Sequence, residues 1–278
     1  MRYTYETAKN NRSIDSRRTF VDALDGQSVL NLDSFESVFN KAEELVKSEY
    51  PKVTGGALSN VRGNWYEWLI TIGMIEFHRN NDNAHYLLPL PNISSYDCAK
   101  LYKDRIYAYI RDLRAKVASI ADVSLITSNP DFVIIDKDVD FELCMPENGL
   151  ITVNFIDNIC QAFLQMEHKC SLDQIKGYVA VKSSLRPDRR LQIAHEGSLM
   201  KALYKHVQTR EWIIDAPGIK YYAISSEVKE ADRNALRTVA THSIVDVGSV
   251  PRAAVDGLLC VFSGAELEVA LNKILIED

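Results

Sequence analysis

Long apolar runs, cysteine pairs and low-complexity segments are all missing from this 278-residue chain. No apolar stretch reaches the roughly 18 to 20 residues that a membrane-spanning helix needs, and the first residues, MRYTYETAKNNRS, lack the apolar core of a signal peptide. The five cysteines include no C-x-x-C pair that would indicate a zinc or redox site. They are Cys98, Cys144, Cys160, Cys170 and Cys260. These absences argue against a membrane protein and favour a cytoplasmic protein whose cysteines are reduced and mainly buried.

The composition favours a folded protein that does not bind nucleic acid by bulk charge. A hydrophobic content of 46% supports a sizeable core, and the absence of a repeat or linker favours one α/β domain over residues 1–278. Within it, residues 1 to about 118 form a mostly helical N-terminal part. The net charge of −6 argues against a protein that coats nucleic acid, but a specific enzyme can still concentrate its cations in one cleft.

Hydrophobic periodicity divides the chain into predicted helices and strands. Helices are predicted where apolar residues recur at helical spacing: 32–50, from about 64, 95–118, 154–168, from about 189, and 266–278. Strands are predicted for short apolar or β-branched runs: 85–91, 124–135 with an interruption at 129–130, 175–185, 220–228 and 243–250. Residues 136–150 are expected to form an irregular connection between these elements.

Four residues have the chemistry of a metal-dependent phosphodiesterase, which needs carboxylates around magnesium and a lysine near the attacking water. Asp131 follows Pro130 at the start of one apolar strand, and Lys182 ends another, so adjacent strands would place both at one sheet edge. Glu196 lies 14 residues after Lys182 on the next helix. Glu67 lies in a strongly apolar helix, where a buried carboxylate needs a partner.

Each of these residues also has an ordinary structural explanation. Pro-Asp pairs are common in turns, and a lysine at a strand end is commonly solvated. Glu196 could stabilise its own helix, and Glu67 could form an ion pair with Arg62. The combination of the four residues, rather than any one of them, favours a nuclease site.

The segment KSSLRPDRR, which begins at Lys182, carries four positive charges and one aspartate in nine residues of an acidic protein. Arginine makes bidentate hydrogen bonds to guanine O6 and N7, and aspartate accepts from the cytosine N4 amino group, so Arg186, Asp188 and Arg189 suit two successive G:C pairs. A helix dipole explains the position of Asp188 but not the arginines on either side of it. Three later cations fit either phosphate contacts or a solvated helix face: Lys201, Lys205 and Arg210.

Three blocks of the sequence, GNWYEWLI, SNPDFVIID and VKSSLRPDRRLQIAHEGSLMKALYKHVQTR, closely resemble the tetrameric type IIF restriction endonucleases that cut CCGG-core sites. The greatest similarity is to members that read purine-CCGG-pyrimidine, within the PD-(D/E)xK nuclease superfamily. The resemblance begins near Asn64, ends in LRTVATHSIVDV and is densest from Lys182 to Arg210. It implies an α/β fold with a restriction-endonuclease-like PD-(D/E)xK core, in which helices flank a central mixed β-sheet.

The resemblance implies a catalytic role for each of the four candidate residues, with Mg²⁺ as cofactor. Asp131 corresponds to the metal-binding acid of the PD element and Lys182 to the lysine of the family motif. Most of the superfamily carries a second acid two positions before this lysine, but here the position holds Ala180, which cannot bind a metal. The family supplies the missing acid from the following helix, which implies Glu196 as a metal ligand. Glu67 corresponds to an additional acid that supports a second metal position.

The resemblance also implies the substrate and the assembly. A type II restriction endonuclease of this kind belongs to a prokaryotic restriction-modification system and cuts both strands of RCCGGY after the purine, leaving four-base 5′ extensions. Arg186, Asp188 and Arg189 correspond to the element that reads CCGG in the major groove. The assembly is a homotetramer built as a dimer of dimers, and Trp212 corresponds to a position near the contact between the dimers.

Two other functions remain open on the sequence alone. One is a sequence-specific CCGG-binding protein that keeps the nuclease scaffold but has lost cleavage, an alternative that Ala180 supports. The other is a nuclease that acts on a repair or recombination intermediate. No residue indicates how the outer purine-pyrimidine pair is distinguished, and indirect reading through the deformability of the base steps fits that absence.

Overall fold

The chain forms two compact units in the computed structural model, which describes residues 2–7, 12–91, 96–125, 130–245 and 250–277. The helical unit consists of Met1–Ala84, Leu143–Cys160 and Val261–Asp278, and the sheet unit consists of His85–Glu142 and Gln161–Cys260. The expectation of one domain, with a helical part up to about residue 118, stays a prediction. None of the helices in the described part of the chain has the length and apolar content needed to span a bilayer.

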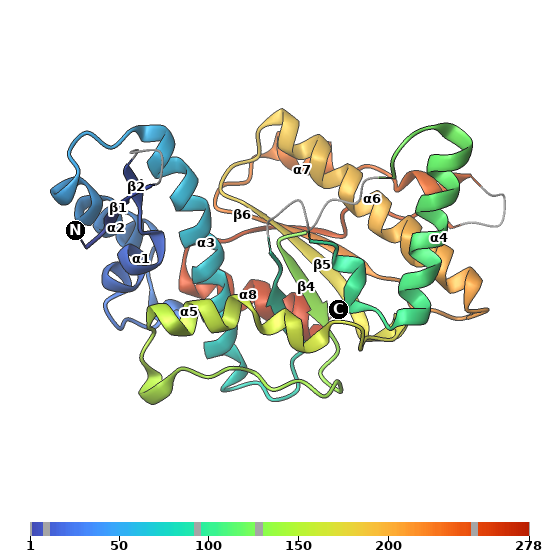
Figure 1. The fold of residues 1–278 in the computed structure, drawn as a ribbon, viewed down its shortest axis with the longest axis horizontal. Helices are drawn as coiled ribbons and strands as arrows, with labels where there is room; N and C mark the ends of the chain where they lie inside the picture. Colours follow the sequence, from blue (N-terminus) through green and yellow to red (C-terminus); the bar gives the residue numbers. More distant parts are fainter. Residues whose placement is uncertain (1, 8–11, 92–95, 126–129, 246–249, 278) are drawn as a thin grey trace. The chain divides into compact units, whose positions relative to one another are not determined.

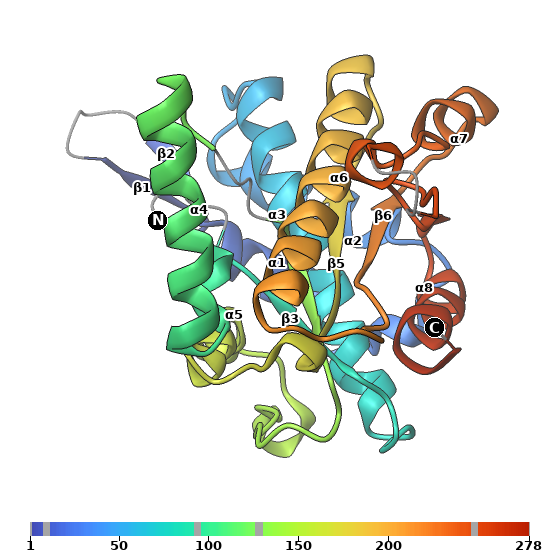
Figure 2. The ribbon, with the colours of Figure 1, turned by 90° about the vertical axis from the view of Figure 1, so that its right-hand side faces the viewer.

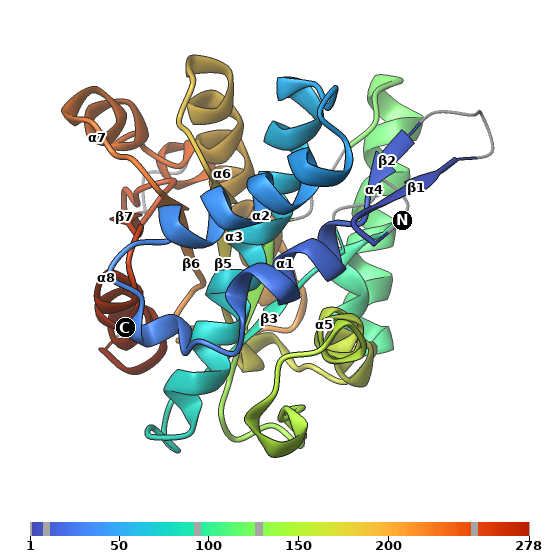
Figure 3. The same ribbon diagram turned by 90° about the vertical axis from the view of Figure 1, so that its left-hand side faces the viewer.

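The helical unit is organised around α3 (Gly55–His78), which is buried along most of its length after Asn64. Two further helices, α1 and α2, contact α3, as Figure 3 shows. Gly73 lets α8 pack against α3, because a Cβ atom at this glycine would lie 2.3 Å from the Leu267 side chain. Besides α3, the elements of this unit are β1 (Thr4–Glu6), β2 (Arg12–Ile14), α1 (Ser16–Leu24), η1 (Val29–Asn31), α2 (Glu36–Glu49), η3 (Glu147–Gly149), α5 (Val153–Cys160), α8 (Gly264–Asn272) and η7 (Lys273–Glu277).

The sheet unit contains a five-stranded mixed sheet in the order β3-β4-β5-β6-β7, which confirms the predicted fold class (Figure 1). Strand β4 is antiparallel to both of its neighbours, β3 and β5, and β5, β6 and β7 are parallel. The strands are β3 (Tyr86–Pro89), β4 (Phe132–Ile135), β5 (Ile175–Lys182), β6 (Lys220–Ser225) and β7 (Gly257–Cys260). The helices are η2 (Cys98–Leu101), α4 (Asp104–Ala121), η4 (Ala162–Met166), η5 (Leu172–Gln174), α6 (Pro187–Arg210), α7 (Glu230–Leu236) and η6 (Thr241–Ile244).

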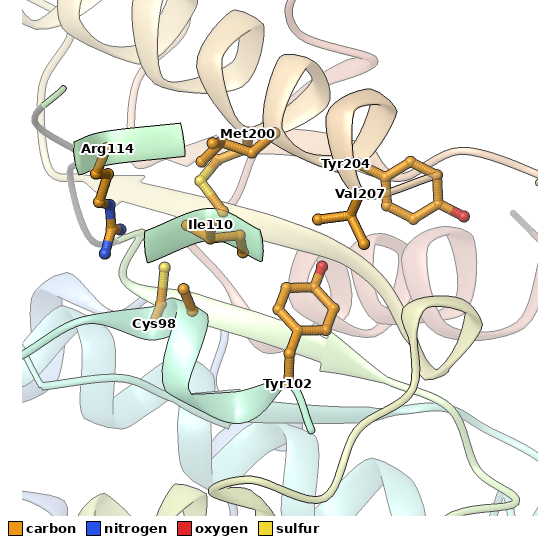
Figure 4. A pocket seen from close by; sticks show the side chains of 9 residues that line it. Cys98, Tyr102, Ile110, Arg114, Met200, Tyr204 and Val207 are labelled. Carbon is orange, nitrogen blue, oxygen red and sulfur yellow. The ribbon is translucent and has the colours of Figure 1, made fainter. Parts of the chain in front are cut away.

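Helices α4 and α6 lie side by side in the sheet unit (Figures 1 and 2). A small pocket of about 10 Å³ lies among their side chains and those of η2. In Figure 4, Cys98 and Tyr102 lie on one side of this pocket, and Met200, Tyr204 and Val207 of α6 lie on the other. The close packing around so small a void places α6 in a fixed position within the unit.

The strand register defines which side chains share the face of the sheet that α6 contacts. Ala180 pairs with Ala223, and Lys182 pairs with Ser225, and residues directly opposite one another point to the same face. Since side chains alternate along a strand, Ala180 and Lys182 of β5 and Tyr221 of β6 all point to one face. Helix α6 contacts β6 on this face.

Several predicted elements differ from the structure. Helix α3 begins at Gly55 rather than near Asn64, because Thr54 caps it by accepting a hydrogen bond from the Ala57 backbone N–H at 3.2 Å. The predicted helix over 154–168 ends at Cys160 and is followed by the short η4. The predicted helix over 95–118 becomes η2 followed by α4.

Two strand predictions were wrong where the structure describes them. In the range 243–250, Ser243 and Ile244 belong to the 3-10 helix η6, and 246–249 lie outside the described residues. In the range 124–135, Ser124 and Leu125 form no strand, while 126–129 lie outside the described residues and β4 follows as predicted. Strand β7 was not predicted.

The cysteines are all free thiols, but they are less buried than predicted. Cys98 and Cys170 are buried, Cys144 and Cys160 are half-buried, and Cys260 is exposed. Burial raises the pKa of Cys98 to about 12, so this thiol stays protonated near neutral pH.

Candidate active site

The structure brings Asp131 and Lys182 together at one end of the sheet, as the sequence predicted. Asp131 is buried and lies one residue before β4, and its Oδ2 accepts hydrogen bonds from the Val181 backbone N–H at 2.6 Å and from Lys182 Nζ at 2.7 Å. Phe132 pairs with Val179, so continuing the antiparallel register by one residue places Asp131 opposite Ala180. Asp131 and Lys182 therefore form an ion pair between a buried carboxylate and a half-buried ammonium group, on the face of the sheet that carries Ala180.

The electrostatic environment of Asp131 links it to Glu196. Burial raises the pKa of Asp131, and the negative charge of Glu196 acts in the same direction. The ammonium group of Lys182 and the hydrogen bond from Val181 oppose both effects. Asp131 thus interacts with both Lys182 and Glu196, and the three side chains form one cluster.

Glu196 reaches the cluster from the middle of α6, and its side chain is held at both oxygens. Its Oε1 accepts a hydrogen bond from Gln192 Nε2 and its Oε2 accepts one from Tyr221 Oη, each at 2.7 Å. Burial, followed by the charge of Glu196, raises the pKa of Tyr221 well above its usual range. Glu196 is 4% exposed, and it bonds both to its own helix through Gln192 and to β6 through Tyr221, so it does more than stabilise its own helix.

Gly197 explains how α6 can approach the sheet at this point. A Cβ atom at Gly197 would lie 2.2 Å from the Ala254 carbonyl oxygen and 3.1 Å from Cδ1 of Tyr221. Any larger side chain would push the helix away from β6. Neither Gly197 nor the two donors to Glu196 stands out in the sequence. Gly197 and Tyr221 meet partners that are distant in the sequence, and a glutamine four residues before a glutamate is common in helices.

Ala180 is fully buried beside these groups. It supplies no oxygen, so it leaves Asp131 and Glu196 as the carboxylates of the cluster. Magnesium is typically held by one or two carboxylates together with water and phosphate oxygens, and these two carboxylates fit that donor set. Among the described residues, no group of three or more His, Cys, Asp or Glu side chains could hold a metal ion.

Glu67 belongs to α3 in the helical unit. Its apolar neighbours in the sequence predicted a buried side chain, but Glu67 is only half-buried. The alternative partner suggested by the sequence, Arg62, forms ion pairs with Glu36 at 2.8 Å and with Glu43 at 4.0 Å. The metal-supporting role of Glu67 stays a prediction.

The predicted recognition residues lie at the exposed start of α6. Arg186 is the N-cap residue, Pro187 follows at the first helical position, and the side chains of Arg186 and Asp188 are 65% and 67% exposed. Arg186 Nη2 lies 3.3 Å from Asp188 Oδ2, and Arg189 Nη1 donates to the Ser184 carbonyl oxygen at 3.4 Å. These are long, weak contacts, so the three side chains can exchange them for contacts with a ligand.

Two other cations of α6, Arg190 and Lys201, are paired with aspartate side chains of the protein. Arg190 forms an ion pair with the buried Asp232 at 3.3 Å. Lys201 is buried, and its Nζ donates to Asp256 Oδ2 and to the Ala253 carbonyl oxygen, each at 2.6 Å. The predicted explanation of Lys201 as part of a solvated helix face was therefore wrong, and its role as a phosphate contact stays a prediction.

Trp212, the predicted interface residue, directly follows the C-cap of α6. Its side chain is 89% exposed, as is that of Ile214, and its backbone φ of 57° lies in the left-handed region that favours glycine. A bulky residue at positive φ is unusual and strained. This conformation leaves the indole open to a partner.

The chain was compared with known proteins. A family model described as Cfr10I/Bse634I restriction endonuclease matches residues 7–277. The type II restriction enzyme Cfr10I of Citrobacter freundii is 39% identical over 282 residues, which cover 96% of this chain and 96% of that enzyme.

Solved structures of the restriction endonuclease Bse634I are also similar. The type IIF enzyme Bse634I with cognate DNA matches with a TM-score of 0.85 and 33% identity, over 98% of this chain and 96% of that one. Another Bse634I structure matches over the same shares with a TM-score of 0.87 and 33% identity. These matches confirm the resemblance drawn from the sequence and the predicted enzyme class. The chain belongs to the Cfr10I/Bse634I family of type II restriction endonucleases.

Proposed function

We propose that this enzyme hydrolyses both strands of double-stranded DNA at RCCGGY, after the purine, in a Mg²⁺-dependent reaction that leaves four-base 5′ extensions. The observation that carries the proposal is the cluster of buried Asp131 and Glu196 with half-buried Lys182, reached by the helix whose first turn exposes Arg186 and Asp188. Similarity to Cfr10I and to Bse634I, which was solved with cognate DNA, supports it.

In the proposed mechanism, water attacks the phosphorus atom and the bond to the leaving oxygen breaks. Asp131 and Glu196 would hold Mg²⁺, and Glu67 would support a second metal position. Bound magnesium would act as a Lewis acid that offsets the charge developing on the phosphate. Lys182, held by Asp131 at 2.7 Å, would position and polarise the attacking water.

Sequence reading is assigned to the first turn of α6. Arg186 and Arg189 have the donors for guanine O6 and N7, and Asp188 has the acceptor for the cytosine N4 amino group. Two copies related by two-fold symmetry would read both halves of the palindrome. The outer purine-pyrimidine pair would be read indirectly, through the deformability of its base steps.

The proposed assembly is a homotetramer formed by two dimers, acting in the cytoplasm of a prokaryotic cell as part of a restriction-modification system. Exposed Trp212 and Ile214 offer apolar area of the kind enriched in interface cores. We expect Trp212→Ala to convert tetramers to dimers in light scattering. An unchanged tetramer would remove Trp212 from the interface, and a monomeric wild-type enzyme would refute the assembly.

The proposal is tested by incubating plasmid DNA that contains RCCGGY sites with the enzyme, with and without Mg²⁺, and sequencing the ends. Double-strand breaks after the purine, only in the presence of Mg²⁺, would support it. Specific binding without cleavage would favour the CCGG-binding protein that Ala180 keeps open. Ends at other sequences or at branched structures would favour a nuclease with a different substrate.

A further inference from the structure

A glutamate that serves as a metal ligand must be held in one orientation. A glutamate side chain has three rotatable torsions, and fixing such a side chain costs conformational entropy. In this enzyme the strand position is Ala180, and the acid proposed as its replacement, Glu196, extends from α6. A metal ligand in this position must be oriented by its neighbours.

We propose that Tyr221 and Gln192 are positioning residues that orient Glu196 as a metal ligand. The inference rests on the proposed role of Glu196 and assigns a new function to the two residues that contact it. Tyr221 donates to Oε2 from the sheet and Gln192 donates to Oε1 from the helix, so the two hydrogen bonds hold both carboxylate oxygens.

Tyr221 provides the rigid part of this support. It is fully buried on β6, a strand that pairs with β5 along one edge and with β7 along the other. It pairs with Tyr178, which places its ring on the same face of the sheet as Ala180 and Lys182. A phenol has few torsions, so its hydroxyl is a well-defined anchor for the carboxylate.

Gln192 provides the second anchor from one helical turn before Glu196. Residues four apart on a helix are neighbours, and the Gln192 Nε2 to Glu196 Oε1 distance of 2.7 Å is that of a good hydrogen bond. Both donors are neutral groups. Their hydrogen bonds therefore orient the carboxylate without cancelling the charge that attracts a cation.

Gly197 makes this arrangement possible. The absence of a side chain lets α6 lie against Tyr221 and the Ala254 carbonyl, at a distance that a Cβ atom would not allow. The neighbouring Glu196 is thereby brought within reach of a hydroxyl on β6. Gln192 and Tyr221 thus contact one carboxylate, and Gly197 allows the helix that carries it to come close enough.

The test compares Tyr221→Phe, which removes only the hydroxyl, with Gln192→Ala at an exposed position that does not threaten the fold. Tyr178→Phe is the matched control, because Tyr178 is a fully buried tyrosine on the same face that pairs with Tyr221. Mg²⁺ is titrated calorimetrically into each protein bound to a CCGG duplex with non-hydrolysable linkages at the cut positions. Duplex affinity without metal and single-turnover cleavage are measured in parallel.

We expect Tyr221→Phe to weaken Mg²⁺ binding by about 10- to 100-fold, as is typical when a partner of a metal ligand is removed. Gln192→Ala should act in the same direction, and Tyr178→Phe should leave Mg²⁺ binding unchanged. Duplex affinity without metal should be unaffected in all three variants. Cleavage at limiting Mg²⁺ should fall in parallel with metal affinity.

Glu196→Gln separates the two levels of the proposal. If this variant binds Mg²⁺ like the wild type, the proposed function of Glu196 fails. If it loses Mg²⁺ while Tyr221→Phe and Gln192→Ala bind normally, only the positioning inference is overturned. Equal losses of metal-free duplex binding and Mg²⁺ binding in Tyr221→Phe would also overturn it, since they would indicate a general structural role. Should Tyr221→Phe not fold, Gln192→Ala decides the question.

Discussion

The first turn of α6 and its middle carry the same kinds of charged residue in opposite environments. Arg186 and Asp188 are mostly exposed and lie 3.3 Å apart in a long contact, whereas Glu196 and Lys201 are 4% and 5% exposed and make short hydrogen bonds to the protein. Charges of the first kind are available to a ligand, and those of the second kind are already oriented. Eight residues of rigid helix, or about 12 Å, separate Asp188 from Glu196. One helix therefore carries both the proposed base-reading residues and the proposed metal ligand Glu196.

The largest effect is expected from Glu196→Gln, which keeps the size and hydrogen-bonding capacity of the side chain but removes its charge. Cleavage should fall by roughly 10³-fold or more, since a charge that holds a catalytic metal contributes several kcal/mol to the reaction. Specific DNA binding should persist or strengthen, because repulsion of the phosphate is relieved. Single-turnover cleavage and duplex binding measure the two quantities.

A substitution at Ala180, on strand β5, also tests whether Glu196 is a metal ligand. Placing a carboxylate at position 180 in the Glu196→Gln variant should restore part of the activity, because that position lies opposite Asp131 on the same face. A Glu196→Gln enzyme that cuts at the wild-type rate would end the assignment of Glu196 as a metal ligand.

The next largest effects are expected from Arg186→Ala and Arg189→Ala, which remove the arginine side chains at the start of α6. Each should cost about 1 to 3 kcal/mol in discrimination between the cognate site and a scrambled duplex, with folding retained. Arg237→Ala, which removes an exposed arginine at the end of α7, is the control. Equal losses of affinity for both duplexes would reduce Arg186 and Arg189 to phosphate contacts.

The smallest effect is expected from Lys201→Met, in the buried half of the helix. Asp256 would lose the lysine but keep its hydrogen bond from the Tyr221 backbone N–H at 2.7 Å, and its side chain is 23% exposed. We expect the free energy of unfolding to fall by about 1 to 2 kcal/mol, with sequence discrimination unchanged. Denaturant unfolding measures this change, with the exposed Lys205→Met as control. A selective loss of DNA affinity instead would place Lys201 among the DNA contacts after all.

Much of the sheet and part of the site were predictable from the sequence. The β-branched run after Gly177 predicts β5, and the apolar run after Asp131 predicts β4, so their ends were expected to bring Asp131 and Lys182 together. By the same pattern, 243–250 should have formed a strand. Instead, Ser243 donates to the Ala240 carbonyl oxygen and accepts from the Arg252 backbone N–H, and these contacts hold a short 3-10 turn.

Residue types and local patterns by themselves determined the family, the strand-borne pair Asp131 and Lys182, and the cluster of charged residues around Asp188 that we propose to read bases. These features depend on residue type and short spacing, which a sequence displays directly. Only the tertiary structure decided which charges of α6 are buried and what holds them. The burial and hydrogen bonds of Glu196 and Lys201 depend on Gly197, Tyr221 and Asp256. Which face of a helix is buried is decided only when the helix packs against a particular strand.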